Sequence, residues 1–188
     1  MKKAVQTVLV FAAAVFFASQ AGAQVTFNAP MQFAGTGCKA GEYSFSGDGT
    51  DTLTVLFSAY DASNPKENAA SGMMRTACSF VVPVKVPPGF QVSTMTSDWR
   101  GYSEGRTQLF REYFFAGQRG PQARSNPKGN YTERDNLMNA TWSGCSGGTI
   151  PLRINSSVRA ITRPSYIAVD TVDLKNKVVF HLQSRRCR

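Results

Sequence analysis

Short segments in which apolar and polar residues alternate recur along most of the chain. The alternation is clearest in residues 52–60, 78–86, 150–160 and 177–183, where the larger apolar side chains fall on one side. A period of two is typical of β-strands that bury one face. No window after residue 23 keeps the 3.6-residue period of an amphipathic helix. The pattern therefore predicts an all-β protein.

Turn-forming residues separate these segments at intervals of about 8–12 residues. Gly47-Asp48-Gly49 favours a hairpin between two strand-like segments. Pro87-Pro88-Gly89 predicts a turn after which residues 90–96 return antiparallel, and Leu174-Lys175-Asn176 predicts a last hairpin. About nine or ten short strands result, which is typical of an antiparallel β-sandwich or flattened barrel.

The first 23 residues form a different kind of segment. Lys2 and Lys3 precede an uncharged apolar run over residues 8–18, and Ala21-Gly22-Ala23 resembles a cleavage site. These features predict a signal peptide over residues 1–23, followed by one β-sandwich domain over residues 24–188. No second apolar segment of spanning length follows, so we expect a secreted or periplasmic protein with no transmembrane segment in the mature chain.

Four cysteines, Cys38, Cys78, Cys145 and Cys187, lie after this segment. Export places them in an oxidising compartment, and their even number predicts two disulfide bonds. Four cysteines allow three pairings, and the sequence does not choose among them. If the strands beside Cys78 and Cys187 pair antiparallel, these two cysteines meet and Cys38 joins Cys145. No spacing matches a zinc or redox motif, so we expect no metal and no cofactor.

The net charge narrows the classes of partner. Of the 21 Lys and Arg, two lie in residues 1–23, which leaves 19 against 12 Asp and Glu in the predicted mature chain. A positive surplus favours attraction to polyanions, such as anionic polysaccharides or cell-surface polymers, with nucleic acid a less favoured candidate. A merely basic exported protein is the alternative, because net charge alone does not identify a partner.

Aromatic residues and arginines interleave in one region. Its members are Trp99, Arg100, Tyr102, Arg106, Arg111 and Tyr113. Aromatic rings stack on sugars, and guanidinium groups bind phosphate or carboxylate, so we predict ligand contact here. The basic segment 118–130, with Arg119, Arg124 and Lys128, is predicted to be an irregular loop that adds electrostatic attraction. In the alternative interpretation, Trp99 and Tyr102 fill one end of the sandwich, and Asp98 pairs with Arg100.

Several motifs in a fixed order resemble those of a known family. They are Gly-Thr-Gly-Cys at 35–38, Pro-Pro-Gly-Phe at 87–90, Asp-Trp-Arg-Gly-Tyr at 98–102, Trp-Ser-Gly-Cys at 142–145 and His-Leu-Gln-Ser-Arg-Arg-Cys at 181–187. This order resembles the exported family called domain of unknown function 4360, over about residues 25–187. The resemblance implies a small secreted disulfide-bonded β domain, and it implies no catalytic residue. The basic segment 118–130 has no counterpart in the resemblance.

Catalytic patterns are weak in this sequence. The one histidine, His181, lies mid-strand without a nucleophile motif. Glycoside hydrolysis needs two carboxylates facing one cleft, for which Asp98, Glu104 and Glu112 are the candidates. We therefore favour a non-enzymatic binding or surface-associated module with an anionic glycan or another polyanion as ligand. The alternatives are a secreted hydrolase that uses a carboxylate pair including Asp98 or Glu112, and a protein-directed adhesion, inhibitor or toxin-like role.

Overall fold

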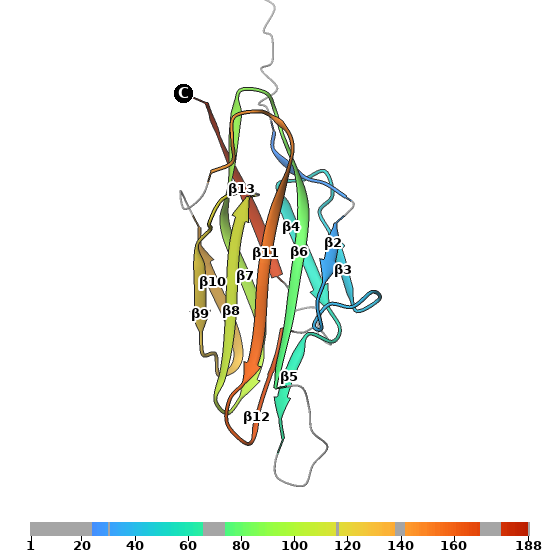
Figure 1. Cartoon of the computed structure of the whole chain (residues 1–188), viewed down its shortest axis with the longest axis vertical. Coiled ribbons are helices and arrows are strands. Elements are labelled where there is room, and N and C mark those ends of the chain that lie inside the picture. Colours follow the sequence, from blue (N-terminus) through green and yellow to red (C-terminus); the bar gives the residue numbers. More distant parts are fainter. Residues whose placement is uncertain are drawn as a thin grey trace, which may run out of the picture.

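The protein folds as an elongated sandwich of two antiparallel β-sheets that pack face to face (Figure 1). The computed structural model describes residues 24–29, 31–65, 74–115, 117–137, 142–169 and 178–187. These ranges contain 13 strands and no helix. The predicted signal peptide lies outside the described residues. Within the described residues, no helix is long and apolar enough to cross a membrane. The all-β, antiparallel sandwich predicted from the alternation is confirmed.

Sheet A has six strands. Its order is β1 (Thr26–Phe27), β6 (Arg75–Val86), β11 (Gly148–Ala160), β8 (Thr107–Phe115) and β9 (Gln122–Ser125), and β2 (Gln32–Ala34) also pairs with β6. The three long strands β6, β11 and β8 lie side by side and form its centre. Strand β8 alternates strictly between buried and partly exposed residues, as a strand with one covered face should.

Sheet B has seven strands. Its order is β3 (Tyr43–Ser46), β4 (Thr52–Phe57), β13 (Val178–Arg186), β7 (Phe90–Glu104), β12 (Ser165–Ala168) and β5 (Asp61–Asn64), and β10 (Gly129–Asn136) also pairs with β7. Strand β7 is the longest, with 15 residues. Strands β13 and β12 follow each other along one edge of β7, and β10 covers the other edge.

The core lies between the sheets and is centred on aromatic side chains. The ring of Phe180 meets those of Phe80, Trp99 and Tyr113 at centroid distances of 5.8, 6.3 and 6.3 Å, all in edge-to-face arrangements. Each aromatic pair of this kind adds about 0.5–1.5 kcal/mol beyond the burial of apolar area. The core therefore joins strands of both sheets at the middle of the sandwich.

The strand number and two predicted hairpins differ from the expectation. The extra strands include β5 and β9, which have four residues each and are too short to show alternation. The turn at Pro87–Gly89 carries the chain from β6 in sheet A to β7 in sheet B, so no hairpin forms there. Strands β12 and β13 both pair with β7 and not with each other. The predicted turn at residues 174–176 lies outside the described residues.

The basic segment 118–130 is more ordered than predicted. It contains β9 and the first residues of β10, and β9 pairs with β8 at the edge of sheet A. Backbone hydrogen bonds between β8 and β9 fix the segment at the sheet edge. The strand therefore forms without alternating apolar residues that would have predicted it. Gly120 is required here, because a Cβ at this position would lie 1.4 Å from the carbonyl oxygen of Tyr113. The prediction of an irregular loop was therefore wrong for much of this segment.

The disulfides join Cys38 to Cys78 and Cys145 to Cys187, so the predicted pairing is wrong. Cys78 lies in β6 of sheet A, whereas Cys187 follows β13 in sheet B, and these strands do not pair. The amide of Gly37 donates to the carbonyl of Ala77 at 3.0 Å, which places Cys38 beside Cys78. Two bonds, as predicted, therefore fasten the chain, with a different connectivity.

Candidate functional site

Three of the six predicted ligand-contact residues lie in the interior. Trp99, Arg111 and Tyr113 are 0%, 2% and 1% exposed. Alternation along β7 and β8 turns these side chains toward the opposite sheet. In this position they offer no surface to a ligand. The alternative interpretation, in which Trp99 is structural, fits its burial.

These three residues share a buried network with Asp135 of β10. The indole nitrogen of Trp99 donates to the hydroxyl of Tyr113 at 2.6 Å, and that hydroxyl donates to Asp135 at 2.5 Å. Arg111 donates from Nε and Nη2 to the two oxygens of Asp135 at 2.8 and 2.7 Å. Burial and the negative charge of Asp135 hold the pKa of Tyr113 well above its ordinary value. The network joins sheet A to sheet B.

The outer face of sheet B holds a second carboxylate–arginine pair. Asp98 of β7 lies directly opposite Arg134 of β10, and Arg134 donates to its two oxygens at 2.6 and 2.7 Å. The hydrogen bonds from Arg134 lower the pKa of Asp98. The alternative interpretation paired Asp98 with Arg100, which is half-buried and lowers the pKa of Asp98 through its charge. A cross-strand neighbour thus replaces a sequence neighbour as its partner.

Two of the three candidate carboxylates of the hydrolase hypothesis, Asp98 and Glu112, do not meet. Asp98 alternates with the inward-facing Trp99 and lies on the outer face of sheet B. Glu112 alternates with Arg111 and Tyr113 and lies on the outer face of sheet A, where it accepts hydrogen bonds from Gln122 and Asn155. Two carboxylates on opposite faces of a sandwich cannot flank one glycosidic bond.

A pocket lies beside the turn between β7 and β8, and we call it the end pocket. This turn is at the end of the sandwich away from the C-terminus (Figure 1). The volume of the pocket is about 680 Å³, within the range of about 300–1,000 Å³ that is typical of small-molecule sites. It is lined by Tyr102, Ser103, Glu104, Gly105, Arg106, Thr107, Asn126, Pro127, Lys128 and Gly129. Two crossings between the sheets, β7 to β8 and β9 to β10, form its walls.

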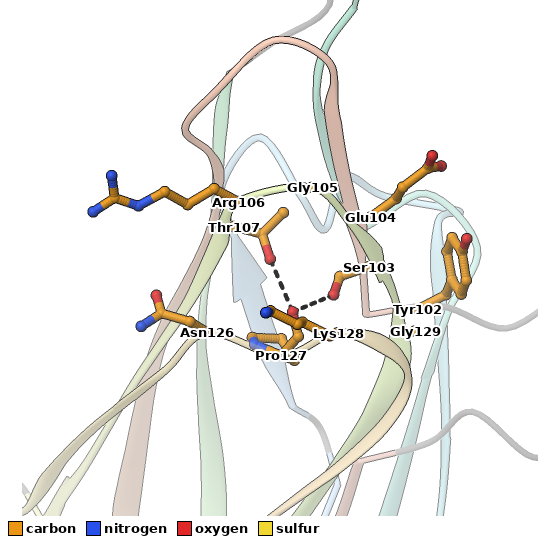
Figure 2. Close-up of a pocket in the computed structure, with 10 residues that line it drawn as sticks. All are labelled: Tyr102, Ser103, Glu104, Gly105, Arg106, Thr107, Asn126, Pro127, Lys128 and Gly129. Atoms are coloured by element: carbon orange, nitrogen blue, oxygen red, sulfur yellow. Dashed lines mark hydrogen bonds between the residues drawn. The ribbon is translucent and has the colours of Figure 1, made fainter.

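Hydrogen bonds hold the two crossings together. The hydroxyls of Ser103 and Thr107 both donate to the carbonyl oxygen of Pro127, at 2.5 and 3.3 Å (Figure 2). Gly105 makes the tight turn between β7 and β8 with a φ of 71°, and a Cβ there would lie 2.5 Å from the carbonyl oxygen of Pro164. The backbone of the end pocket is therefore fixed by contacts on both sides.

The side chains of the end pocket point in two directions. Tyr102 and Glu104 extend to one side, and Arg106 and Asn126 extend to the other (Figure 2). Tyr102 is 41% exposed, and Arg106 and Lys128 are exposed and form no ion pair within the described residues. An exposed ring and two free cations can stack on a sugar and attract an anionic group.

Sequence reasoning named Tyr102, Arg106 and Lys128 but missed the groups that hold them in place. These groups are Ser103, Thr107 and Pro127, whose hydrogen bonds join the turn between β7 and β8 to the connection between β9 and β10. No local sequence pattern predicts such a contact. His181 lies in β13 with Nδ1 3.3 Å from the hydroxyl of Thr52. The described residues contain no group of His, Cys, Asp and Glu that could hold a metal ion.

The comparisons with known proteins agree with the resemblance noted in the sequence. The family model described as Domain of unknown function (DUF4360) matches residues 11–187. The chain belongs to the DUF4360 family. A relative in this comparison is an "Uncharacterized secreted protein" of Arthroderma benhamiae, 28% identical over 178 residues, which cover 84% of this chain and 70% of the relative. With its two disulfides, this DUF4360 protein is an exported protein, secreted or periplasmic.

Two solved structures resemble this DUF4360 chain loosely. One is TmCBM61 in complex with β-1,4-galactotriose, at a TM-score of 0.36 and 9% identity, covering 84% of this chain and 89% of that one. Another is the enzymatically active domain of bacteriophage CBA120 tailspike protein 4, at a TM-score of 0.31 and 15% identity, covering 81% of this chain and 19% of that one. At these scores neither ligand nor activity transfers to this chain.

Proposed function

We propose that this DUF4360 protein is a secreted, non-enzymatic module that binds an anionic glycan at the end pocket. The observation that carries the proposal is the exposed ring of Tyr102 in a pocket that is also lined by Arg106 and Lys128, two cations that form no ion pair within the described residues. A ring face stacks on the apolar face of a sugar, and the cations attract its acidic groups. The positive surplus of the whole chain adds long-range attraction.

Binding has more support than hydrolysis at this site. Glu104 is the one carboxylate among the lining residues, whereas glycoside hydrolysis uses two. The hydroxyls of Ser103 and Thr107 already donate to the Pro127 carbonyl. The His181 imidazole lies on another strand, beside Thr52. The lining residues therefore supply recognition groups without a nucleophile and its base.

Glycan binding also has more support than the protein-directed alternative. The large apolar side chains exposed in the described part of the chain are Phe45, Met74 and Tyr102, which come from three separate segments. Single exposed apolar residues are ordinary on protein surfaces. Of these three side chains, Tyr102 lines a pocket that also holds charged neighbours.

Titration calorimetry with polygalacturonate, and with neutral dextran as the uncharged control, tests the proposal. We expect binding to polygalacturonate only, and weaker binding as salt rises, because ions screen exposed charges. Tyr102→Ala should weaken binding about tenfold, equivalent to roughly 1.4 kcal/mol. The matched control is Phe45→Ala, which removes an exposed ring from β3 and should leave the affinity unchanged.

The charge component has its own pair of variants. Lys128→Gln should weaken binding, whereas Lys85→Gln removes an exposed lysine of β6 that does not line the end pocket and should have little effect. Equal losses in Lys128→Gln and Lys85→Gln would show that only net charge matters. Equal affinities of wild type and Tyr102→Ala for polygalacturonate would contradict glycan binding at the end pocket.

A further inference from the structure

Three arginines surround a hollow on the outer face of sheet A, which we call the arginine hollow. It is lined by Arg75, Gln108, Phe110, Arg124, Ser157 and Arg159 and has a volume of about 280 Å³. The arginines come from three strands, because Arg75 lies in β6, Arg159 in β11 and Arg124 in β9. Pairing of β6, β11, β8 and β9 places them together despite large separations in sequence.

The register brings like charges into direct opposition. Arg159 lies opposite Arg75 on one side and opposite Gln108 on the other. Like charges in directly opposite positions destabilise a sheet. The lining residues include no carboxylate, and none of the three arginines forms an ion pair within the described part of the chain. An anion bound in the hollow would offset this repulsion.

Two contacts orient the guanidinium groups. The guanidinium of Arg124 lies over the ring of Phe110 at 5.3 Å from its centroid, a cation–π contact. Phe110 lies directly opposite Arg124 in the pairing of β8 with β9. Nη2 of Arg75 lies 3.5 Å from the hydroxyl of Ser157, which is buried. Guanidinium groups held in this way keep other N–H donors free for a ligand.

Size and charge select the class of ligand. A volume of about 280 Å³ is at the lower limit of about 300 Å³ for small-molecule sites, so it suits a single charged group better than a sugar chain. Planar guanidinium donors match the oxygens of phosphate in a bidentate manner. Three positive charges are balanced better by a phosphate monoester, with about −1.5 to −2 charges at pH 7, than by one carboxylate.

We propose that the arginine hollow binds a phosphate monoester group. The site is separate from the end pocket, and its existence does not depend on glycan binding there. It lies nearby, because Gln108 follows Arg106 by two residues and Asn126 follows Arg124 by two, roughly 7 Å along a strand. A phosphorylated polymer held in the hollow could therefore also reach the end pocket.

NMR titration of the purified protein tests this site with three probes at constant ionic strength. The probes are inorganic phosphate, glucose 6-phosphate and acetate. We expect saturable shifts of the Nε–H signals of Arg75, Arg124 and Arg159 with both phosphates and none with acetate. Tighter binding of glucose 6-phosphate than of inorganic phosphate would identify an ester as the preferred form, and the reverse order would overturn that preference.

Matched variants locate the binding. Arg159→Gln should weaken phosphate binding about tenfold, the effect of losing a hydrogen bond between charged groups. The control is Arg153→Gln, which removes an exposed arginine from the same strand and face, about 20 Å away, and should change affinity less than twofold. Arg124→Gln provides a second variant at the strand edge, with the expected loss of the same order.

Three results would overturn the proposal. They are the absence of saturable arginine shifts with phosphate, equal binding of acetate, and equal losses in Arg159→Gln and Arg153→Gln. Tyr102→Ala separates this proposal from the previous one, because it should leave phosphate binding unchanged while it weakens binding to polygalacturonate. Loss of phosphate binding in Tyr102→Ala would instead show that the two sites are one.

Discussion

The two faces of β8 carry similar residues in opposite circumstances. On the inner face, Arg111 and Tyr113 share the carboxylate of Asp135 and are buried. On the outer face, Phe110 carries the guanidinium of Arg124 beside two further arginines, and the lining contains no carboxylate. The comparison shows why arginine next to an aromatic ring is not by itself evidence of a ligand site. Such a pair is a candidate site only where no acidic side chain neutralises the arginine.

The largest expected effect comes from breaking the buried network. Asp135→Asn leaves the Arg111 guanidinium buried without its counter-charge, which should cost about 3–5 kcal/mol in the free energy of unfolding. Urea denaturation measures this value. The exposed Glu104 provides the control, because Glu104→Gln should cost less than about 0.5 kcal/mol. A small effect of Asp135→Asn would contradict the claim that Asp135 supplies the counter-charge that the buried Arg111 requires.

A smaller loss should follow from removing one hydroxyl of the network. Tyr113→Phe keeps the ring but leaves the indole N–H of Trp99 without its acceptor and Asp135 without one donor. We expect a cost of about 1–3 kcal/mol, the usual penalty for an unsatisfied buried polar group. Tyr43→Phe, in which the ring stacks on Phe33 at the partly buried edge of the core, is the control. Equal urea midpoints for the two variants would contradict the network.

The smallest effect concerns the pair of Asp98 and Arg134, in which the carboxylate is buried and the guanidinium is exposed, in contrast to the fully buried pair of Arg111 and Asp135. Hydrogen bonds from Arg134, with the charges of Arg100 and His181, lower the pKa of Asp98 below 3.8 in the folded state. The stabilisation is therefore present above pH 3.8 and is lost as the pH falls through the lower folded pKa. Asp98→Asn should flatten the decline of the melting temperature below pH 4, about where an unfolded aspartate titrates. An unchanged pH profile in this variant would mean that the pair contributes nothing.

The sequence predicts the strands well where one face is clearly apolar. The hairpin at Gly47–Thr50 is confirmed, since β3 pairs with β4. In residues 109–115 both faces carry aromatic rings, so alternation cannot decide which face is buried. The decisive group is Asp135, 24 residues beyond Arg111, and no local pattern links the two. The same limit applies to the disulfides and to the crossing at Pro87–Gly89, because both depend on which sheet each strand joins.

The candidate sites show the same limit. Tyr102 and Arg106 lie next to a turn, where exposure follows from turn chemistry, and both line the end pocket, while their contact with a ligand stays a prediction. Arg75 and Arg159 lie on polar faces of two alternating strands, and each alone resembles an ordinary solvated arginine. Only the pairing of β6 with β11 places them opposite each other. Sheet order is a long-range property, so the arginine hollow could not be predicted.

Mapping backbone amide shifts with a short oligogalacturonate tests the central claim most directly, because it compares both ends of the sandwich at once. The opposite end provides an internal comparison, since Arg185 stacks there on Trp142 with 4.0 Å from its guanidinium carbon to the ring centroid. We predict saturable shifts in residues 102–107, Asn126, Lys128 and Gly129, with the signals of Trp142 and Arg185 unchanged. Shifts centred on Trp142 and Arg185, with no shifts in the residues of the end pocket, would contradict glycan binding at the end pocket.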